Sequence, residues 1–385
     1  MNKIIIESKK KVLLVASVYS HFTAFHVPYI KFLQSIGYEV WIASNHSKRV
    51  NTAKTELEEE GAKCIDIDLP RSPFTIKTIE GLSQIIKLLK SHDFSMIHVH
   101  TPNAAFITRL ANFFSEKIPL IYTAHGFHFY KGAPLINWLI YFPLEYIAKY
   151  WTDRVITINY EDYYRALKMG YNEGSVKYVH GVGVEEDNLI LNEDDKKNFK
   201  HTLGLNNDSV VISYIAEINN NKNHRFLIRN WTKIKEQIPE AVLLLIGDGN
   251  LRSEIENMII RDDLRDIYLL GYRKDVNKIL RISDIVSLLS RREGLPKSIM
   301  EAMENKLPCV VTDTRGLRDL ITHNSNGYVI ELEDDNGLIN AFVDLLKDQS
   351  LRKKMGNSAF KRVQPYLIKN VLNEYIEIYN EILID

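Results

Sequence analysis

The sequence has few cysteines and no excess of charge of either sign. Only two of its 385 residues are cysteines, Cys64 and Cys309, and both lie in apolar runs that are typical of buried strands. Two cysteines cannot build a disulfide scaffold, which favours a reducing compartment. Lysine and arginine total 49, and aspartate and glutamate also total 49. Because nucleic-acid binders usually carry a basic excess, we expect no nucleic-acid partner.

Long apolar runs and zinc-binding spacings are also missing. No stretch reaches the ~20 apolar residues that a membrane-spanning helix needs. The run VLLVASV near the N-terminus is short and lacks a clear cleavage site, so we interpret it as a buried strand rather than a signal peptide. No H-x-x-x-H pair or Cys/His cluster has the spacing of a zinc site. These absences predict a cytoplasmic protein, at most peripheral on the inner face of the membrane, without a metal.

Apolar runs of strand length alternate with helical patterns along the whole chain. Apolar residues make up 45% and charged residues 25%, as in ordinary globular proteins, and the length favours two domains. In the first half, strands are expected at 11–18, 39–44, 95–100, 119–125 and 153–158, and helices at 24–36, 78–91, 104–115 and 135–150. The strand runs are continuously apolar, which is typical of parallel strands that are covered on both faces.

The stretch 180–201 interrupts this rhythm with two glycines and a charged run. The pattern then restarts, with strands expected at 210–217, 241–249, 266–272, 284–290, 308–313 and 327–331. We therefore predict an α/β protein of two tandem, doubly wound, Rossmann-like domains, 1–183 and 184–365, that face each other across a cleft. The last helical segment, 366–385, is expected to cross back to the first domain. Ligands of such sheets bind at the carboxyl ends of the strands.

The segment SRREGLPKSIMEAMENKLP, residues 290–308, carries the clearest chemical signal. Glu293 and Glu301 are separated by seven residues, and Pro296 is suited to the first turn of a helix over 296–305. Gly294 lets the backbone before this helix approach a ligand closely. A helix start binds anions, and here the N–H groups that would hold a diphosphate are those of Leu295, Lys297 and Ser298. The alternative is an ordinary capped helix with Glu301 solvated on its face.

This segment resembles the E-x7-E motif of family 4 retaining glycosyltransferases, which have the GT-B fold. The resemblance extends to YTAHGFHFYKGAP (122–134) and TDRVITINYEDY (152–163), and it is strongest with bacterial members that assemble capsules and exopolysaccharides. It implies a nucleoside diphosphate sugar as donor, with UDP favoured, and neither metal nor cofactor. It also implies that Glu293 contacts the donor sugar, that Glu301 holds the ribose, and that the backbone over 294–298 takes the phosphates.

The basic residues of the family pattern are only partly present. The family places an arginine and a lysine five residues apart after the first strand of the second domain. Lys222 matches the lysine, but Glu217 stands at the arginine position. Since a carboxylate cannot neutralise a diphosphate, Arg292 and its neighbour Arg291 are the candidates to supply the missing charge. Without the resemblance, Lys222 would be interpreted as a surface lysine in an asparagine-rich turn.

Other candidates follow predicted strands. Gly247 follows a strand in the second domain, where a tight turn explains it equally well. Tyr272 and Arg273 match the family loop that lies against the nucleobase, although they also fit an exposed strand end. In the first domain the resemblance places His125 beside the reacting sugar. The acceptor side is assigned to Ser20, His21 and Asn103, which also follow strands, although the usual double-glycine loop is absent.

The segment 126–151 is unusually aromatic and has lysines near both ends. Such a segment either lies at a bilayer surface, ready for a lipid-linked acceptor, or forms a core helix with an aromatic lining. Together these features predict a hexosyl- or N-acetylhexosaminyltransferase that acts on a glycan or lipid-linked acceptor. The alternatives are an epimerase similar to UDP-N-acetylglucosamine 2-epimerase and a non-catalytic nucleotide-sugar binder. A nicotinamide dehydrogenase is disfavoured because no G-x-G-x-x-G follows the first strand.

Overall fold

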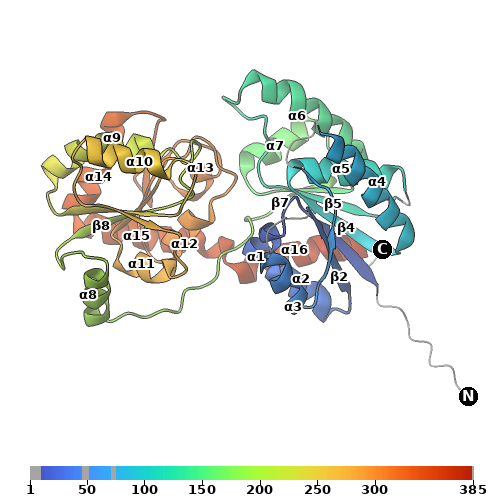
Figure 1. The fold of residues 1–385 in the computed structure, drawn as a ribbon, viewed down its shortest axis with the longest axis horizontal. Coiled ribbons are helices and arrows are strands. Elements are labelled where there is room, and N and C mark those ends of the chain that lie inside the picture. The colour runs from blue at the N-terminus through green and yellow to red at the C-terminus, as the bar shows by residue number, and fades with distance from the viewer. Residues whose placement is uncertain (1–9, 46–51, 71–74, 116, 384–385) are drawn as a thin grey trace, which may run out of the picture. The chain divides into compact units, whose positions relative to one another are not determined.

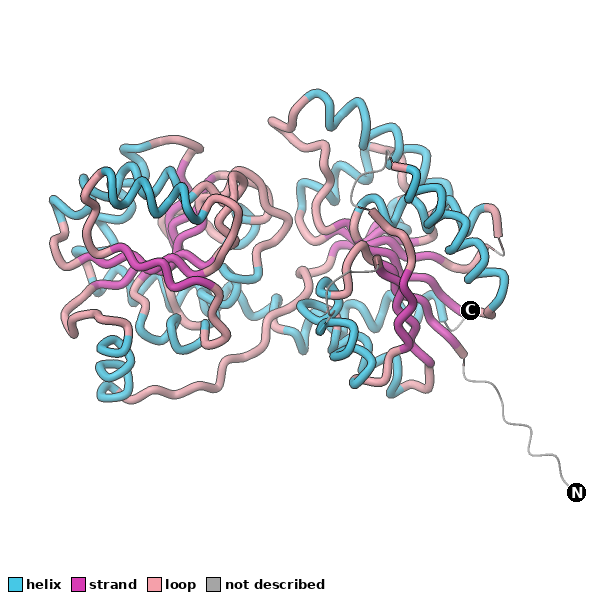
Figure 2. The backbone as a smooth tube through the Cα atoms, viewed as in Figure 1, coloured by secondary structure: helices cyan, strands magenta, loops and turns pink. Residues whose placement is uncertain are grey.

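The computed structural model describes residues 10–45, 52–70, 75–115 and 117–383. The chain divides into two compact units, residues 1–183 with 368–385 (unit 1) and residues 184–367 (unit 2). Each unit holds one parallel sheet, and helices cover both faces of that sheet (Figures 1 and 2). The predicted α/β class with two doubly wound sheets is thus confirmed.

Unit 1 has a seven-stranded sheet in the order β3-β2-β1-β4-β5-β6-β7. Its strands are β1 (Lys11–Val15), β2 (Glu39–Ser44), β3 (Lys63–Asp66), β4 (Phe94–His100), β5 (Leu120–Ala124), β6 (Arg154–Thr157) and β7 (Val176–Tyr178). The five strands predicted for this half are present. The two edge strands, β3 and β7, were missed because edge strands are short and only partly covered, so neither carries a continuous apolar run.

The helices of unit 1 surround this sheet. They are α1 (Ser20–Phe25), α2 (Val27–Ser35), α3 (Thr52–Glu59), α4 (Ile76–Ser91), α5 (Pro102–Phe113), α6 (Leu135–Ala148), α7 (Tyr160–Lys168) and α16 (Ile368–Leu383), with single 3-10 turns η1 (Lys149–Trp151) and η2 (Glu173–Ser175). The single helix predicted over 24–36 is two helices, α1 and α2. They meet at His26, whose backbone leaves helical geometry at φ −126° and ψ 2°. Because the chain bends there, the side chain of His26 is buried rather than solvated.

Unit 2 has a six-stranded sheet in the order β10-β9-β8-β11-β12-β13. Its strands, all predicted, are β8 (Val210–Ile215), β9 (Ala241–Ile246), β10 (Ile267–Gly271), β11 (Ile285–Leu288), β12 (Cys309–Thr312) and β13 (Gly327–Ile330). Its helices are α8 (Glu193–Thr202), α9 (His224–Gln237), α10 (Arg252–Arg261), α11 (Val276–Ile282), α12 (Lys297–Glu304), α13 (Leu317–Leu320), α14 (Asp335–Lys347) and α15 (Gln349–Val363), with the 3-10 turn η3 (Gln364–Tyr366).

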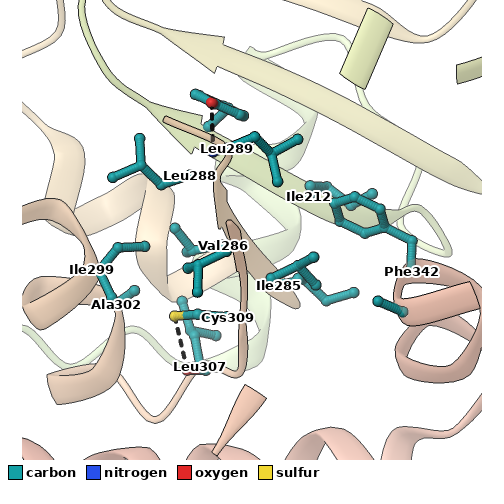
Figure 3. Packing of buried hydrophobic residues seen from close by; sticks show 14 of the residues in the cluster. Ile212, Ile285, Val286, Leu288, Leu289, Ile299, Ala302, Leu307, Cys309 and Phe342 are labelled. Atoms are coloured by element: carbon teal, nitrogen blue, oxygen red, sulfur yellow. Dashed lines mark hydrogen bonds between the residues drawn. The ribbon is translucent and has the colours of Figure 1, made fainter. Parts of the chain in front are cut away.

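The core of unit 2 fixes the position of α12. Ile299 and Ala302 on this helix are fully buried and belong to the same apolar cluster as Val286 and Leu288 of β11 (Figure 3). The apolar residues of α12 recur at helical spacing, so one face enters the core and the other stays available. The start of α12 is therefore held firmly against the carboxyl end of β11.

Candidate functional site

Each sheet has a switch point, where the strand order changes direction between two neighbouring strands. In unit 2 these strands are β8 and β11, and in unit 1 they are β1 and β4. Ligands of doubly wound sheets bind outside the carboxyl ends of the strands at this point. In unit 2 the two loops at the switch point are tied together. The Arg291 N–H donates to the Asn221 carbonyl at 2.8 Å, and the Asn221 side-chain amide donates to the Arg292 carbonyl at 2.9 Å.

An ion pair joins Lys222 and Glu293 at this switch point. Lys222 Nζ lies 2.6 Å from Glu293 Oε1, and only 22% and 10% of the two side chains are exposed. The Lys222 N–H donates to Asn219 Oδ1 at 3.0 Å, and the Lys222 carbonyl accepts from the Tyr214 hydroxyl. Lys222 is therefore a positioned cation, not the loosely held surface lysine of the alternative interpretation.

The backbone around Glu293 is packed tightly against the loop after β12. Gly316 has φ +75°, and a Cβ there would lie 2.0 Å from the Gly294 carbonyl oxygen, so only glycine fits. The neighbouring Arg315 is buried, and its Nε donates to the Glu293 carbonyl at 3.1 Å. Arg315 was not predicted, because it acts on the backbone of the motif from a different loop. Its signal in the sequence is an arginine followed by a glycine after a predicted strand.

The start of α12 has the geometry expected of an anion site. The helix runs from Lys297 to Glu304, one residue shorter at each end than predicted, and Pro296 precedes it in an extended conformation. No side chain among the described residues caps this end. The N–H groups of its first turn include those of Lys297 and Ser298. They are therefore available to a ligand, as the first N–H groups of any helix lack partners within the helix.

A cavity of about 290 Å³ lies beside α12 and contains the second motif glutamate. It is lined by Glu185, Glu186, Asp187, Lys274, Val276, Asn277, Leu280, Lys297, Glu301, Glu304 and Asn305. Burial raises the pKa of Glu301, while Lys297, whose Nζ lies 3.8 Å away, acts in the opposite direction. Glu301 thus lines an open polar cavity with 33% of its side chain exposed, which disfavours the alternative of a fully solvated glutamate on the helix face.

Several predicted donor residues do not line this cavity. Tyr272 is 78% exposed, and the Arg273 guanidinium pairs with the Asp275 carboxylate at 2.7 and 2.8 Å. Their neighbour Lys274 lines it instead. Packing explains why a glycine stands at Gly247, because a Cβ there would lie 2.0 Å from the Ala216 carbonyl oxygen.

The charged residues near the missing arginine position differ in their exposure and in their ion pairing. Glu217 is exposed and Arg292 is half-buried. Arg291 pairs with Glu333 at 2.6 Å, so its charge is already partly neutralised. Arg292, the other predicted substitute for the family arginine, precedes Glu293 directly.

In unit 1, four histidines converge at the carboxyl ends of β1, β4 and β5. His100 ends β4, His125 follows β5, His21 lies in α1, and His26 separates α1 from α2. One ring nitrogen from each lies within 4.8 Å of the others. The distances His26 Nε2 to His100 Nδ1 and His100 Nδ1 to His125 Nε2 are both 3.2 Å. Sequence spacing could not show this cluster, because it is assembled from three strand ends.

Burial keeps these imidazoles neutral. It lowers the pKa of His21 to about 4 and lowers the pKa of His26, His100 and His125 well below the usual range. The neighbouring histidines add to the effect on the last three, since a second positive charge nearby is unfavourable. Neutral imidazoles have lone pairs to offer to a hydroxyl, a proton or a metal ion.

The backbone next to this cluster is strained. Thr101, which follows His100 directly, has φ 59° and ψ 132°, a conformation that β-branched residues avoid. Its hydroxyl compensates by bonding the Ser17 N–H and the Ser17 hydroxyl, both at 3.0 Å. Strain of this kind, held in place by its surroundings, occurs preferentially at functional sites.

The predicted acceptor-side residues are only partly brought together. His21 joins His125 in the cluster, with ring centroids 4.7 Å apart. Ser20 is exposed at the start of α1. Asn103 is buried, donates to the Pro70 carbonyl, and lines a separate cavity of about 20 Å³ with aromatic residues.

Two parallel, doubly wound units, each with polar residues at its switch point, define the GT-B class of glycosyltransferases. Comparison with known proteins agrees with this class. The family described as "Glycosyl transferases group 1" matches residues 195–362, and "Glycosyl transferase 4-like" matches residues 11–159. The chain is 31% identical over 375 residues to the putative glycosyltransferase EpsD of Bacillus subtilis, covering 96% of each chain. The chain belongs to the family 4 glycosyltransferases.

Two further comparisons describe its relatives. An Escherichia coli enzyme, UDP-Gal:alpha-D-GlcNAc-diphosphoundecaprenol alpha-1,3-galactosyltransferase, is 29% identical over 323 residues, covering 82% of this chain and 83% of its own. The crystal structure of HepE from Anabaena, in complex with UDP and glucose, superimposes with a TM-score of 0.80. That match covers 97% of this chain and 100% of HepE at 17% identity, so it supports the fold.

Proposed function

We propose that this glycosyltransferase moves a sugar from a UDP-sugar, with retention at the anomeric carbon and without a metal, to a glycan or lipid-linked acceptor of a cell-surface polysaccharide. The observation that carries the proposal is the half-buried Lys222–Glu293 pair beside the start of α12. The names of two relatives support the substrate class. The E. coli relative uses UDP-Gal and a diphosphoundecaprenol acceptor, and CapM of Staphylococcus aureus, 25% identical, acts in capsular polysaccharide biosynthesis.

The arrangement suits the departure of a diphosphate. As the bond between the anomeric carbon and the phosphate oxygen breaks, negative charge develops on that oxygen. The N–H groups at the start of α12 and the Lys222 ammonium stabilise it. The acceptor oxygen then bonds to the anomeric carbon on the same face, and its proton passes to the departing phosphate oxygen. Glu293 accepts hydrogen bonds from the sugar, Glu301 holds the ribose, and His125 of unit 1 lies beside the reacting sugar.

Nucleotide binding provides the first test of this proposal. A ligand that binds only the folded protein raises its stability, by about 2.7 kcal/mol at a concentration 100 times its Kd. We expect UDP to raise the thermal unfolding midpoint measured by scanning fluorimetry, with a smaller shift from ADP. No shift with any nucleoside diphosphate would contradict the donor class. A new nucleotide sugar formed from UDP-N-acetylglucosamine without an acceptor would instead indicate an epimerase.

Lys222→Ala tests the role of the cation. Hydrogen bonds to charged groups contribute about 1.5–3 kcal/mol, so we expect UDP to bind roughly 10- to 100-fold more weakly, as measured by calorimetry. Lys278→Ala, an exposed lysine on α11 in the same unit, is the matched control and should bind UDP as the wild type does. Equal affinities for all three proteins would remove Lys222 from the site.

Contact with a membrane is proposed for α6. Among the described residues, no helix is both long and apolar enough to cross a bilayer. One side of α6 packs into the core through Trp138, Tyr141 and Phe142, as the core-helix interpretation expected. The other side exposes Leu135 and Leu139 (78% and 67%) together with Ile136, Tyr146 and Ile147. Lys149 lies over the Tyr146 ring at 3.8 Å. Apolar and aromatic groups beside lysines suit an anionic bilayer surface.

Vesicle sedimentation tests this contact. We expect the protein to sediment with vesicles that contain anionic lipid and much less with neutral ones. The variant Leu135→Asp with Leu139→Asp should bind several-fold less, because charged side chains do not enter the acyl boundary. Ile260→Asp, an equally exposed isoleucine on α10 (77%), is the control and should behave as wild type. Vesicle binding that is identical in all variants would show that α6 is not the contact.

A further inference from the structure

We propose that His21, His26, His100 and His125 form a binding site for one transition-metal cation, with tetrahedral Zn²⁺ as the preferred occupant. The proposed transfer requires no metal here, although it uses one of the four side chains, His125, and the donor residues of unit 2 take no part in the cluster. The inference rests on the convergence of four imidazole nitrogens from three strand ends.

The spacing of these nitrogens matches a tetrahedral zinc site. Zinc binds imidazole nitrogen at about 2.0–2.1 Å, which places two nitrogens of a tetrahedron about 3.3 Å apart. The distances from His100 Nδ1 to His26 Nε2 and to His125 Nε2 are both 3.2 Å. His21 completes the set, with its ligating atom within 4.8 Å of the others. Zinc binding would draw the remaining pairs, which lie within 4.8 Å, to the tetrahedral spacing.

Hydrogen bonding alone does not satisfy these groups. A neutral imidazole nitrogen carries either one hydrogen or one lone pair. His100 Nδ1 touches two other ring nitrogens, so it can form a linear hydrogen bond with only one of them. In addition, His21 Nε2 is buried and has no hydrogen-bond partner within the described residues. Buried polar atoms without partners are rare and commonly indicate an absent water or ion.

The chemistry and accessibility of the ligands also suit a metal. Imidazole is a ligand that suits Zn²⁺, Cu²⁺ and Ni²⁺ but not Mg²⁺ or Ca²⁺. His26 and His100 are buried, whereas His21 and His125 are partly exposed, so an ion can reach the cluster from their side.

His98 lies next to the proposed site but is not one of its ligands. It is buried next to His100, with ring centroids 4.2 Å apart. Both of its nitrogens are already used, Nδ1 by the Tyr379 hydroxyl at 2.9 Å and Nε2 by the Thr123 hydroxyl at 2.8 Å. A histidine engaged in this way has no lone pair to offer, so we exclude it from the ligand set.

Cobalt substitution tests the proposal without any transfer assay. Untagged, full-length protein is stripped with EDTA and titrated with Co²⁺, whose visible absorption is intense in tetrahedral sites and weak in octahedral ones. We expect one Co²⁺ per chain with the tetrahedral spectrum, and its displacement by Zn²⁺. We expect His26→Gln and His100→Gln to bind Co²⁺ at least about tenfold more weakly. Even the loss of a residue that only hydrogen-bonds to a metal ligand lowers metal affinity by about 10- to 100-fold. His92→Gln, a half-buried histidine outside the cluster, should bind as wild type.

A second measurement guards against variants that fail to fold. X-ray absorption of the zinc-loaded wild-type protein should show imidazole nitrogen as the principal ligand. A weak octahedral cobalt spectrum, a zinc shell dominated by oxygen, or wild-type affinity in both folded variants would overturn the proposal. UDP binding by unit 2 is measured separately, so a failure here leaves the proposed donor site unaffected.

Discussion

Glu293→Gln is expected to lower kcat by at least about 100-fold while leaving the protein folded. Glutamine has nearly the same shape, so the change removes only the negative charge. It takes away the partner that lies 2.6 Å from Lys222 Nζ, and it turns one sugar-binding oxygen into a donor. Removing a single preorganised electrostatic contact from an active site typically costs 10²–10³ in kcat. Initial rates with a UDP-sugar and a lipid-linked acceptor measure the effect.

A matched pair in the same unit provides the control. Arg225 and Glu254 also form an ion pair, but it is exposed, with 40% and 43% of the side chains accessible, and Glu254 lies on α10 rather than in either loop at the switch point. Glu254→Gln should therefore turn over at the wild-type rate. If Glu293→Gln retained full activity with the same donor, the assignment of the E-x7-E motif as the catalytic site would be wrong.

Arg109→Met is expected to destabilise the protein by about 3–5 kcal/mol, the usual cost of removing one partner of a buried ion pair. The Arg109 guanidinium is fully buried and grips the Glu145 carboxylate with two hydrogen bonds of 2.6 and 2.9 Å. It also stacks 4.3 Å from the centre of the Tyr122 ring. Burial acts to lower the pKa of Arg109, but the Glu145 charge more than offsets this, so the pKa is raised. Methionine would leave Glu145 charged, buried and without its arginine.

For Arg109→Met, calorimetry should show the unfolding midpoint lowered by roughly 10 °C, because each kcal/mol of lost stability lowers it by about 2–4 °C in a unit of this size. Arg154→Met is the control. Its pair with Glu381 is partly exposed, and such pairs contribute only about 0–1 kcal/mol. A double variant, Arg109→Met with Glu145→Met, should recover much of the loss, because it leaves no unpaired charge. An unchanged midpoint in the single variant would show that this pair does not stabilise unit 1.

The strands could be predicted because parallel strands are buried on both faces and therefore appear as continuous apolar runs. This physical reason holds for β8, β9 and β11, and it fails for the edge strands β3 and β7, which are short and half-exposed. It also fails at His26, where a helical pattern continues through a break between two helices. Periodicity reports which side chains are buried, but it does not report the backbone angle of a single residue.

The proposed donor site was predictable to the extent that it is local. Glu293, Glu301 and the start of α12 lie within one short segment, so their spacing could be interpreted directly. Lys222 needed the family pattern, and the structure then supplied its contact with Glu293. Arg315 was missed because it approaches Glu293 from the loop after β12. Tyr272 and Arg273 were expected at the nucleobase, yet their neighbour Lys274 lines the cavity.

The sequence by itself determined the two-fold repetition of a parallel α/β unit and the helix that begins inside the E-x7-E motif, because both depend on residues that are close together along the chain. Only the tertiary structure decided which distant residues share a site. The four histidines of unit 1 and the pair Arg109–Glu145 leave no local pattern. They meet because the strand order of a doubly wound sheet brings together the ends of strands that are far apart in the sequence, and no spacing along the chain encodes that order.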